Sequence, residues 1–250
     1  MRSLLIAPAD EKRLAEALKS GADAVVVDLA RAAPAEIAGA RAAAARFLKG
    51  TRGRGGGGPM LIVRPNPLDS GEMDSDLDAV MAHAPDAILL PGSLGGASVQ
   101  QLSVKLAVRE ADHSLADGLT RIIAVADTAQ SLFHMGSYRG SSARLIGVAW
   151  SAEALRADIG AESAYDRPGD YAGPYRLARD LTLLAATSAG VAAIDAVFRD
   201  LRDAEGLRGE ALAARRDGFT GKMAIDPAQV GVINDVFPSR STPIAEGYPR

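Results

Sequence analysis

Charged and polar residues recur where short apolar runs of this sequence end. These residues are Asp28, Arg64, Asp127, Ser151, Glu153, Asp195 and Asp226. Carboxylate oxygens suit a hard cation such as Mg²⁺. A guanidinium group offers a planar fork that matches a carboxylate or an oxo acid. The residue types therefore predict a site for a small anion, with carboxylates available for a metal ion.

Arg64 is the strongest candidate for an anion contact. It ends the run MLIVR and is followed by Pro65-Asn66-Pro67, whose prolines hold the chain extended and restrict the loop. A guanidinium held in this way suits a carboxylate ligand. The alternative is a structural salt bridge at the rim of the fold, and the pattern favours the ligand.

Asp127 closes the run RIIAVAD, where it can bind Mg²⁺ with water and substrate completing the coordination shell. One carboxylate is insufficient for such a site. The segment SAEAL at 151–155 supplies Glu153 as the second candidate ligand. A helix N-cap is an equally open interpretation of Asp127.

Two further acids end apolar runs. Asp28 can orient a water, a ligand or Arg64, and it can equally cap a helix. Asp226 is followed by Pro227, which is typical of a first helical position. Capping is therefore the favoured interpretation of Asp226.

The segments that carry these residues alternate eight times between an apolar run and a helix-like stretch. The runs are SLLIAP, DAVVVDLA, MLIVRPN, DAILLP, RIIAVADT, RLIGVAWS, AAIDAVF and KMAID. This alternation is typical of a (β/α)8 barrel, an α/β fold also called a TIM barrel. The carboxyl ends of its strands form one face, so we expect the seven polar residues to surround one mouth.

The boundaries of smaller segments follow from glycine and proline. We expect helices over 34–48, 176–189 and 206–218, the last two ending at Gly190 and Gly218. The run TRGRGGGGP at 51–59 is typical of a flexible loop, and it precedes a strand instead of opening a helix as a phosphate-binding loop does. The long segment 155–175 lies where a lid belongs. One barrel domain over 1–238 and a polar tail over 239–250 are expected.

The composition limits the classes of ligand and metal site that we expect for this protein. The 250 residues are 48% apolar and contain no cysteine, which excludes disulfides and thiolate metal sites. The formal net charge of −3 with mixed signs predicts a small-molecule partner and no nucleic acid. No run is long enough for a membrane span, and the start is unlike a signal peptide, so a cytoplasmic protein is expected. His83, His113 and His134 lack metal-ligand spacing.

Three stretches, at 2–29, 63–70 and 197–235, resemble the beta subunit of citrate lyase and the malyl-CoA lyases of the HpcH/HpaI aldolase superfamily. The resemblance spans nearly the whole chain. It implies a (β/α)8 barrel that forms a homo-oligomer, a trimer or a hexamer. It also implies an enzyme that uses Mg²⁺ to cleave or form a carbon–carbon bond in a hydroxyacyl-CoA.

The resemblance gives Arg64 the role of binding the substrate carboxylate. Five sites, with six residues in all, depart from the family pattern: Asp127 replaces a metal-binding Glu, Ala154 replaces a metal-binding Asp, Ala30-Arg31 replaces Glu-Asp, Gly92 replaces Lys, and Asp226 replaces His. Losing a metal ligand raises the barrier to forming an enolate. The changes therefore lie at the positions that carry the family's chemistry.

Two functional hypotheses remain open. The first is a Mg²⁺-dependent carbon–carbon lyase acting on a hydroxyacyl-CoA or a 2-oxo acid. In it Arg64 and Asp28 are catalytic, Arg64 and Asp127 bind substrate, and Asp127 and Glu153 bind the metal. The second is a noncatalytic ligand-binding or assembly homologue of the same fold. The sequence leans towards the enzyme, because Arg64, Asp127 and Glu153 still offer a minimal anion and metal site.

Overall fold

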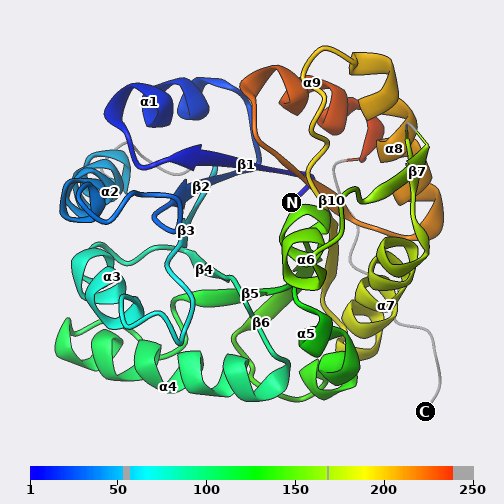
Figure 1. The fold of residues 1–250 in the computed structure, drawn as a ribbon. Coiled ribbons are helices and arrows are strands. Elements are labelled where there is room, and N and C mark those ends of the chain that lie inside the picture. Colours follow the sequence, from blue (N-terminus) through cyan, green and yellow to red (C-terminus); the bar gives the residue numbers. More distant parts are fainter. Residues whose placement is uncertain (53–56, 168, 239–250) are drawn as a thin grey trace.

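The computed structural model describes residues 1–52, 57–167 and 169–238, and in this part of the chain eight parallel strands close into a barrel (Figure 1). The strands are β1 (Ser3–Pro8), β2 (Ala24–Asp28), β3 (Met60–Arg64), β4 (Ala87–Leu90), β5 (Arg121–Ala126), β6 (Leu145–Trp150), β9 (Ala192–Asp195) and β10 (Gly221–Ala224). They follow one another around the barrel in chain order, and β10 pairs with β1. The expected (β/α)8 barrel is confirmed, with a strand at each of the eight apolar runs.

Helices surround the barrel and connect its strands (Figure 1). They are α1 (Glu11–Lys19), α2 (Ile37–Arg52), α3 (Met73–Val80), α4 (Gly96–Asp112), α5 (Ala129–His134), α6 (Ala152–Ile159), α7 (Gly173–Ala189), α8 (Ala204–Asp217) and α9 (Pro227–Val236), with the 3₁₀ turns η1 (Met81–His83) and η2 (Met135–Tyr138). A short antiparallel hairpin, β7 (Tyr165–Arg167) and β8 (Asp170–Tyr171), lies outside the barrel sheet. No helix in the described ranges is long and apolar enough to cross a membrane.

Two of the expected helix ends, at Gly190 and Gly218, are confirmed, whereas α7 and α8 begin before the expected 176 and 206 and α2 continues beyond the expected 48. Gly190 and Gly218 follow α7 and α8 in the left-handed conformation, with φ of 71° and 117°, which glycine adopts without a Cβ clash. The expected start of α2 at Pro34 is wrong, because a turn in which Glu36 N donates to Ala33 O precedes the helix at Ile37. Part of the glycine-rich run, 53–56, and the tail 239–250 lie outside the described residues.

Side chains alternate along each strand between the barrel interior and the layer of helices. The interior cluster contains Leu4, Ile6, Ala24, Val26, Ile62, Leu89, Ile123, Val125, Ala149, Ile194 and Met223. The alternate residues pack in the larger cluster between the strands and the helices. A residue that follows an interior residue by two positions also faces the barrel axis. This alternation decides which polar groups at the strand ends face the mouth.

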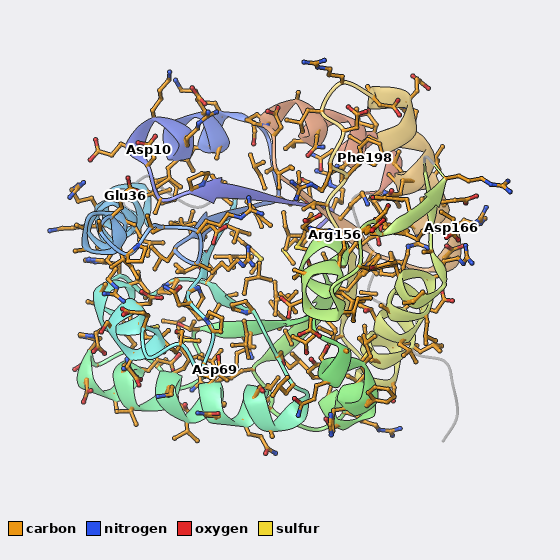
Figure 2. The ribbon with its side chains drawn as sticks, in the orientation of Figure 1. Asp10, Glu36, Asp69, Arg156, Asp166 and Phe198 are labelled. Atoms are coloured by element: carbon orange, nitrogen blue, oxygen red, sulfur yellow. The ribbon has the colours of Figure 1, made fainter. Side chains whose placement is uncertain are left out.

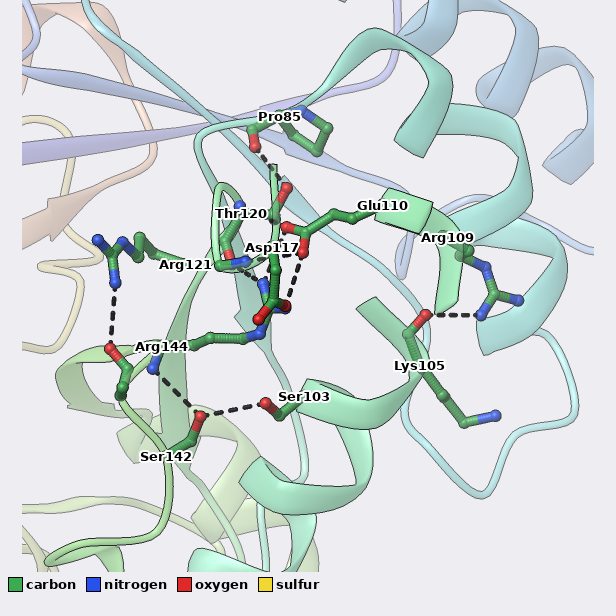
Figure 3. Close-up of polar contacts among 12 residues, drawn as sticks. Pro85, Ser103, Lys105, Arg109, Glu110, Asp117, Thr120, Arg121, Ser142 and Arg144 are labelled. Carbon is green, nitrogen blue, oxygen red and sulfur yellow. Dashed lines mark hydrogen bonds and ion pairs between the residues drawn. The ribbon is translucent and has the colours of Figure 1, made fainter. Parts of the chain in front are cut away.

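A buried ionic network joins α4 to the amino ends of β5 and β6, opposite the mouth (Figure 3). Arg144 donates to both oxygens of Glu110, at 2.8 and 2.7 Å, and to Asp117 Oδ1 at 2.6 Å. Glu110 also accepts from the backbone N–H groups of Gly118 and Thr120. Since both partners are buried and both carboxylate oxygens are hydrogen-bonded, the network holds the loop that leads into β5.

Candidate anion site at the barrel mouth

Three of the predicted residues face the barrel axis at the carboxyl ends of their strands. Asp28 follows the interior residue Val26 by two positions, and Arg64 follows Ile62 in the same way. Asp127 continues the interior row of β5, one residue beyond the strand. The alternation thus brings a guanidinium and two carboxylates to one mouth, as expected.

Asp28 holds Arg64 in place. Arg64 Nη1 lies 3.3 Å from Asp28 Oδ2, and the Asp28 side chain is only 1% exposed. Asp28 Oδ1 accepts from Ala30 N at 3.1 Å. Burial raises the pKa of Asp28, while the positive charges of Arg64 and Arg31 lower it. Of the roles open to Asp28, orienting Arg64 is the one this geometry supports, because α2 begins nine residues later and is not capped by it.

Asp127 is buried in the wall of the mouth. Its Oδ1 accepts from Gly92 N at 3.0 Å. Burial raises the pKa of Asp127 to about 6, and the charge of Arg64 and the Gly92 hydrogen bond oppose that rise. The helix-cap interpretation of Asp127 is wrong, because Thr128 caps α5 by accepting from Ser131 N. Asp127 is therefore held in the wall of the mouth by Gly92 N and lies close enough to Arg64 to feel its charge.

Glu153 lies in the first turn of α6, which Ser151 caps by accepting from Ala154 N. In Figure 1, α6 lies inside the ring of the other helices, and Figure 2 labels Arg156 on it. Glu153 Oε1 accepts from Arg156 Nη2 at 2.7 Å, and Arg199 Nη1 lies 4.0 Å from Oε2. These partners lower the pKa of Glu153. The side chain is 42% exposed and already faces two cations.

Asp195 does not join the mouth, so the expectation that it does is wrong. It falls on the outward row of β9 and is fully buried against the helices. It accepts from Trp150 Nε1 at 2.9 Å, Lys222 Nζ at 2.9 Å and Arg179 Nε at 3.2 Å. Asp195 instead ties β6, β9, β10 and α7 together.

Asp226 caps α9, as expected. Its Oδ1 accepts from Ala228 N at 2.8 Å, and Pro227 is the first helical residue. Asp226 also lines a cavity of about 300 Å³ with Asp28 and Arg31. Its remaining oxygen is therefore near the mouth, although its main role is structural.

Arg31 is the mouth residue whose role the sequence did not reveal. Its Nε lies 3.5 Å from Asp28 Oδ2, and its side chain is 59% exposed. Its spacing of three residues from Asp28 was the available signal. Without a known loop conformation, that spacing did not show that both arginines approach the same carboxylate.

The carboxylates of the mouth do not fit a magnesium site as they stand. Among the described residues, no group of three or more His, Cys, Asp or Glu side chains is placed to hold a metal ion. Asp127 accepts a backbone N–H beside Arg64, and Glu153 pairs with Arg156. Ala154 offers no ligand atom. A Mg²⁺ ion would have to be held by two carboxylates that already face cations.

Comparisons with known proteins give the ancestry of this arrangement. The chain is 32% identical to the citrate lyase subunit beta of Leuconostoc mesenteroides subsp. cremoris over 181 residues, which are 72% of this chain and 58% of that protein. It is 32% identical to a (3S)-malyl-CoA thioesterase of Cereibacter sphaeroides over 238 residues, 94% of this chain and 76% of that protein.

Solved structures with a similar fold come from the same group of proteins. The citrate lyase beta subunit from M. tuberculosis complexed with oxaloacetate and magnesium has a TM-score of 0.78 and 29% identity, covering 95% of this chain and 96% of that chain. CitE from Mycobacterium tuberculosis in complex with magnesium, acetoacetate and coenzyme A has a TM-score of 0.78 and 30% identity. The match covers 96% of this chain and 82% of that chain. A family model described as HpcH/HpaI aldolase/citrate lyase matches residues 2–227. The chain therefore belongs to the HpcH/HpaI aldolase/citrate lyase family.

Proposed function

We propose that the barrel mouth binds the carboxylate of a small 2-oxo acid through Arg64, and that the chain cleaves or forms a carbon–carbon bond in a hydroxyacyl-CoA thioester. The observation that carries the proposal is the Asp28–Arg64 pair, in which a buried carboxylate holds a guanidinium at the carboxyl end of β3. The family relationship supports the reaction class, because relatives include a citrate lyase subunit and a structure complexed with oxaloacetate.

Each mouth residue has a role in this proposal. Arg64 uses one nitrogen on Asp28, so the rest of its fork is free for a bidentate contact with the substrate carboxylate. Asp28 is a positioning residue that acts through Arg64. Asp127 contacts the substrate beside Gly92 N. In cleavage, the substrate hydroxyl group loses its proton and becomes the carbonyl of the oxo acid, which stays paired with Arg64. The electrons of the broken carbon–carbon bond enter the thioester enolate, which takes up a proton to give the acyl-CoA.

We expect the mouth to bind magnesium only weakly. Asp127 and Glu153 are the residues that would hold the ion, as the sequence suggests, but their arginine partners and Ala154 disfavour a tight site. Fewer free carboxylate oxygens leave more of the ion's dehydration cost uncompensated. Neither the Arg64 contact nor its positioning by Asp28 depends on the ion.

Product analysis with malyl-CoA and citryl-CoA tests the proposal. A lyase releases an acyl-CoA and an oxo acid, whereas a thioesterase releases free CoA and the intact hydroxy acid. We expect oxo acid release, and we expect its loss in Arg64→Ala. Release of free CoA with the intact hydroxy acid would replace the lyase by a thioesterase.

The second candidate is a noncatalytic binder. It is favoured by one observation, that Glu153 is bound by Arg156 and that its neighbour Ala154 carries no carboxylate. A panel of hydroxyacyl thioesters distinguishes the two functions. Oxo acid binding through Arg64 without turnover of any thioester would favour the binder.

A further inference from the structure

We propose that Arg31 joins Arg64 in supplying the positive charge of the mouth, so that the site binds a small dicarboxylate without a divalent cation. The inference rests on the proposed function, because it assumes that Arg64 binds a substrate carboxylate. It goes further by naming the second anion contact and by removing the need for metal in binding.

The two guanidinium groups share one counterion. Arg31 Nε lies 3.5 Å and Arg64 Nη1 lies 3.3 Å from the same atom, Asp28 Oδ2. Asp28 supplies one negative charge to the two cations, and Asp127 lies beside Arg64. In the described part of the chain, the charged group within 4 Å of Arg31 is Asp28, which Arg31 shares with Arg64, and the Arg31 side chain is 59% exposed. An anionic ligand is a further partner that the two guanidinium groups can accept, beside a buried carboxylate where screening by solvent is reduced.

Most hydrogen-bond donors of the two arginines are unused. A guanidinium carries five N–H donors. The Arg64 side chain makes a single hydrogen bond, to Asp28, with the described part of the chain, and the Arg31 side chain makes none there. By contrast, Arg156 donates to Glu153 and to Ala161 O. Arg31 and Arg64 therefore retain forks for two carboxylates, while Arg156 is bound to α6 and to the loop that follows it.

The space beside Arg31 suits a small acid. Asp28 and Arg31 line the cavity of about 300 Å³, together with apolar atoms of Pro8, Leu201 and Ile225. This volume is at the lower end for ligand pockets. Arg13 and Glu16, which lie 3.8 Å apart, also line this cavity, and Asp226 caps α9 there. Arg31 is the cation of this cavity that lies 3.5 Å from Asp28, the residue that holds Arg64.

The same arginines oppose a divalent cation. Asp28 faces Arg31 and Arg64, Asp127 is influenced by Arg64, and Glu153 faces Arg156 and Arg199. Arg31 also contributes to the lowered pKa of Glu153, which extends its influence to the predicted metal ligand. A doubly charged ion would be repelled by these guanidinium groups. A dicarboxylate would be attracted by them.

Calorimetric titration with oxaloacetate and with pyruvate, each in EDTA and in Mg²⁺, tests the inference. Oxaloacetate should bind with the same affinity in both buffers. Arg31→Ala should weaken oxaloacetate at least about tenfold, because one charge-assisted contact is lost. Pyruvate has a single carboxylate, and its contact with Arg64 is retained in Arg31→Ala. Its affinity for this variant should therefore fall less than about threefold.

Matched variants separate the contact from a general loss of charge. Arg46→Ala removes a similarly exposed arginine, which pairs with Glu11 away from the mouth, and it should leave both affinities unchanged. Arg31→Lys keeps the charge but loses the fork, so its oxaloacetate affinity should lie between those of the wild type and Arg31→Ala. Circular dichroism verifies that each variant is folded.

Two results would overturn the inference while the proposed function stands: oxaloacetate binding that requires Mg²⁺, or oxaloacetate binding that is unchanged in both Arg31 variants. Failure of oxaloacetate and pyruvate to bind in either buffer would contradict the proposed function itself. So would binding that survives Arg64→Ala.

Discussion

Among the mouth residues, Asp127 is a carboxylate that is buried where its charged form is unfavourable. Its pKa is raised from 3.8 to about 6, so the folded chain binds this proton more tightly than the unfolded chain does. Between these two values the stability contributed by Asp127 falls as pH rises, and the full cost of burying the charge is present above about pH 6.

Asp127→Asn should therefore stabilise the protein at pH 8 by about 1 to 3 kcal/mol. The amide oxygen can still accept from Gly92 N, while the buried charge is removed. Urea unfolding of both proteins between pH 4 and 8 measures the effect. Between pH 4 and 8 the variant should lose less stability than the wild type does. An unchanged slope in the variant would show that Asp127 does not cause it.

Ala154 gives a second residue-scale prediction. Ala154→Asp returns a carboxylate to the first turn of α6, beside Glu153, and should strengthen Mg²⁺ binding about tenfold or more, because another charged oxygen offsets dehydration. Calorimetry with MgCl₂ measures the change. The matched change Ala111→Asp, at the exposed carboxyl-terminal end of α4 and away from the mouth, is the control. Equal affinities for wild type and Ala154→Asp would mean that a second ligand is already present.

At the scale of elements, the sequence predicted all eight barrel strands, because runs such as VVVD and LIVR are long enough to be buried and end at polar residues. It could not predict that Asp195 faces outward. Strands buried on both faces show little alternation of polarity, so nothing marked Ile194 as an interior residue. The contacts of Arg31 depend on a loop conformation that spacing does not determine.

The Glu110–Arg144 network supplies a prediction at this scale. Glu110→Gln should lower the free energy of unfolding by roughly 3 kcal/mol, because Arg144 remains buried with less countercharge. Asp74→Asn, which weakens exposed pairs with Lys105 and Arg109, should cost about 1 kcal/mol or less. Urea unfolding compares the two variants. Equal losses would show that burial does not set the strength of the network.

For the whole molecule, we expect a homo-oligomer, a trimer or a hexamer. Phe133 on α5 is 87% exposed, and Leu177 and Leu184 on α7 are 55% and 63% exposed. Large exposed apolar side chains are typical of surfaces that associate. Light scattering coupled to size exclusion should give a mass of three or six chains, and Phe133→Glu should reduce it. A monomeric mass at micromolar concentration would contradict this expectation.

The barrel positions a mouth whose defining feature is an arginine held by a buried aspartate, and oxaloacetate titration against Arg64→Ala tests that feature most directly. The variant should bind oxaloacetate at least about a hundredfold more weakly, because a bidentate charge-assisted pair is lost. Arg121→Ala, at the opposite end of the barrel, should bind as the wild type does. Wild-type affinity in Arg64→Ala would show that the anion site lies elsewhere.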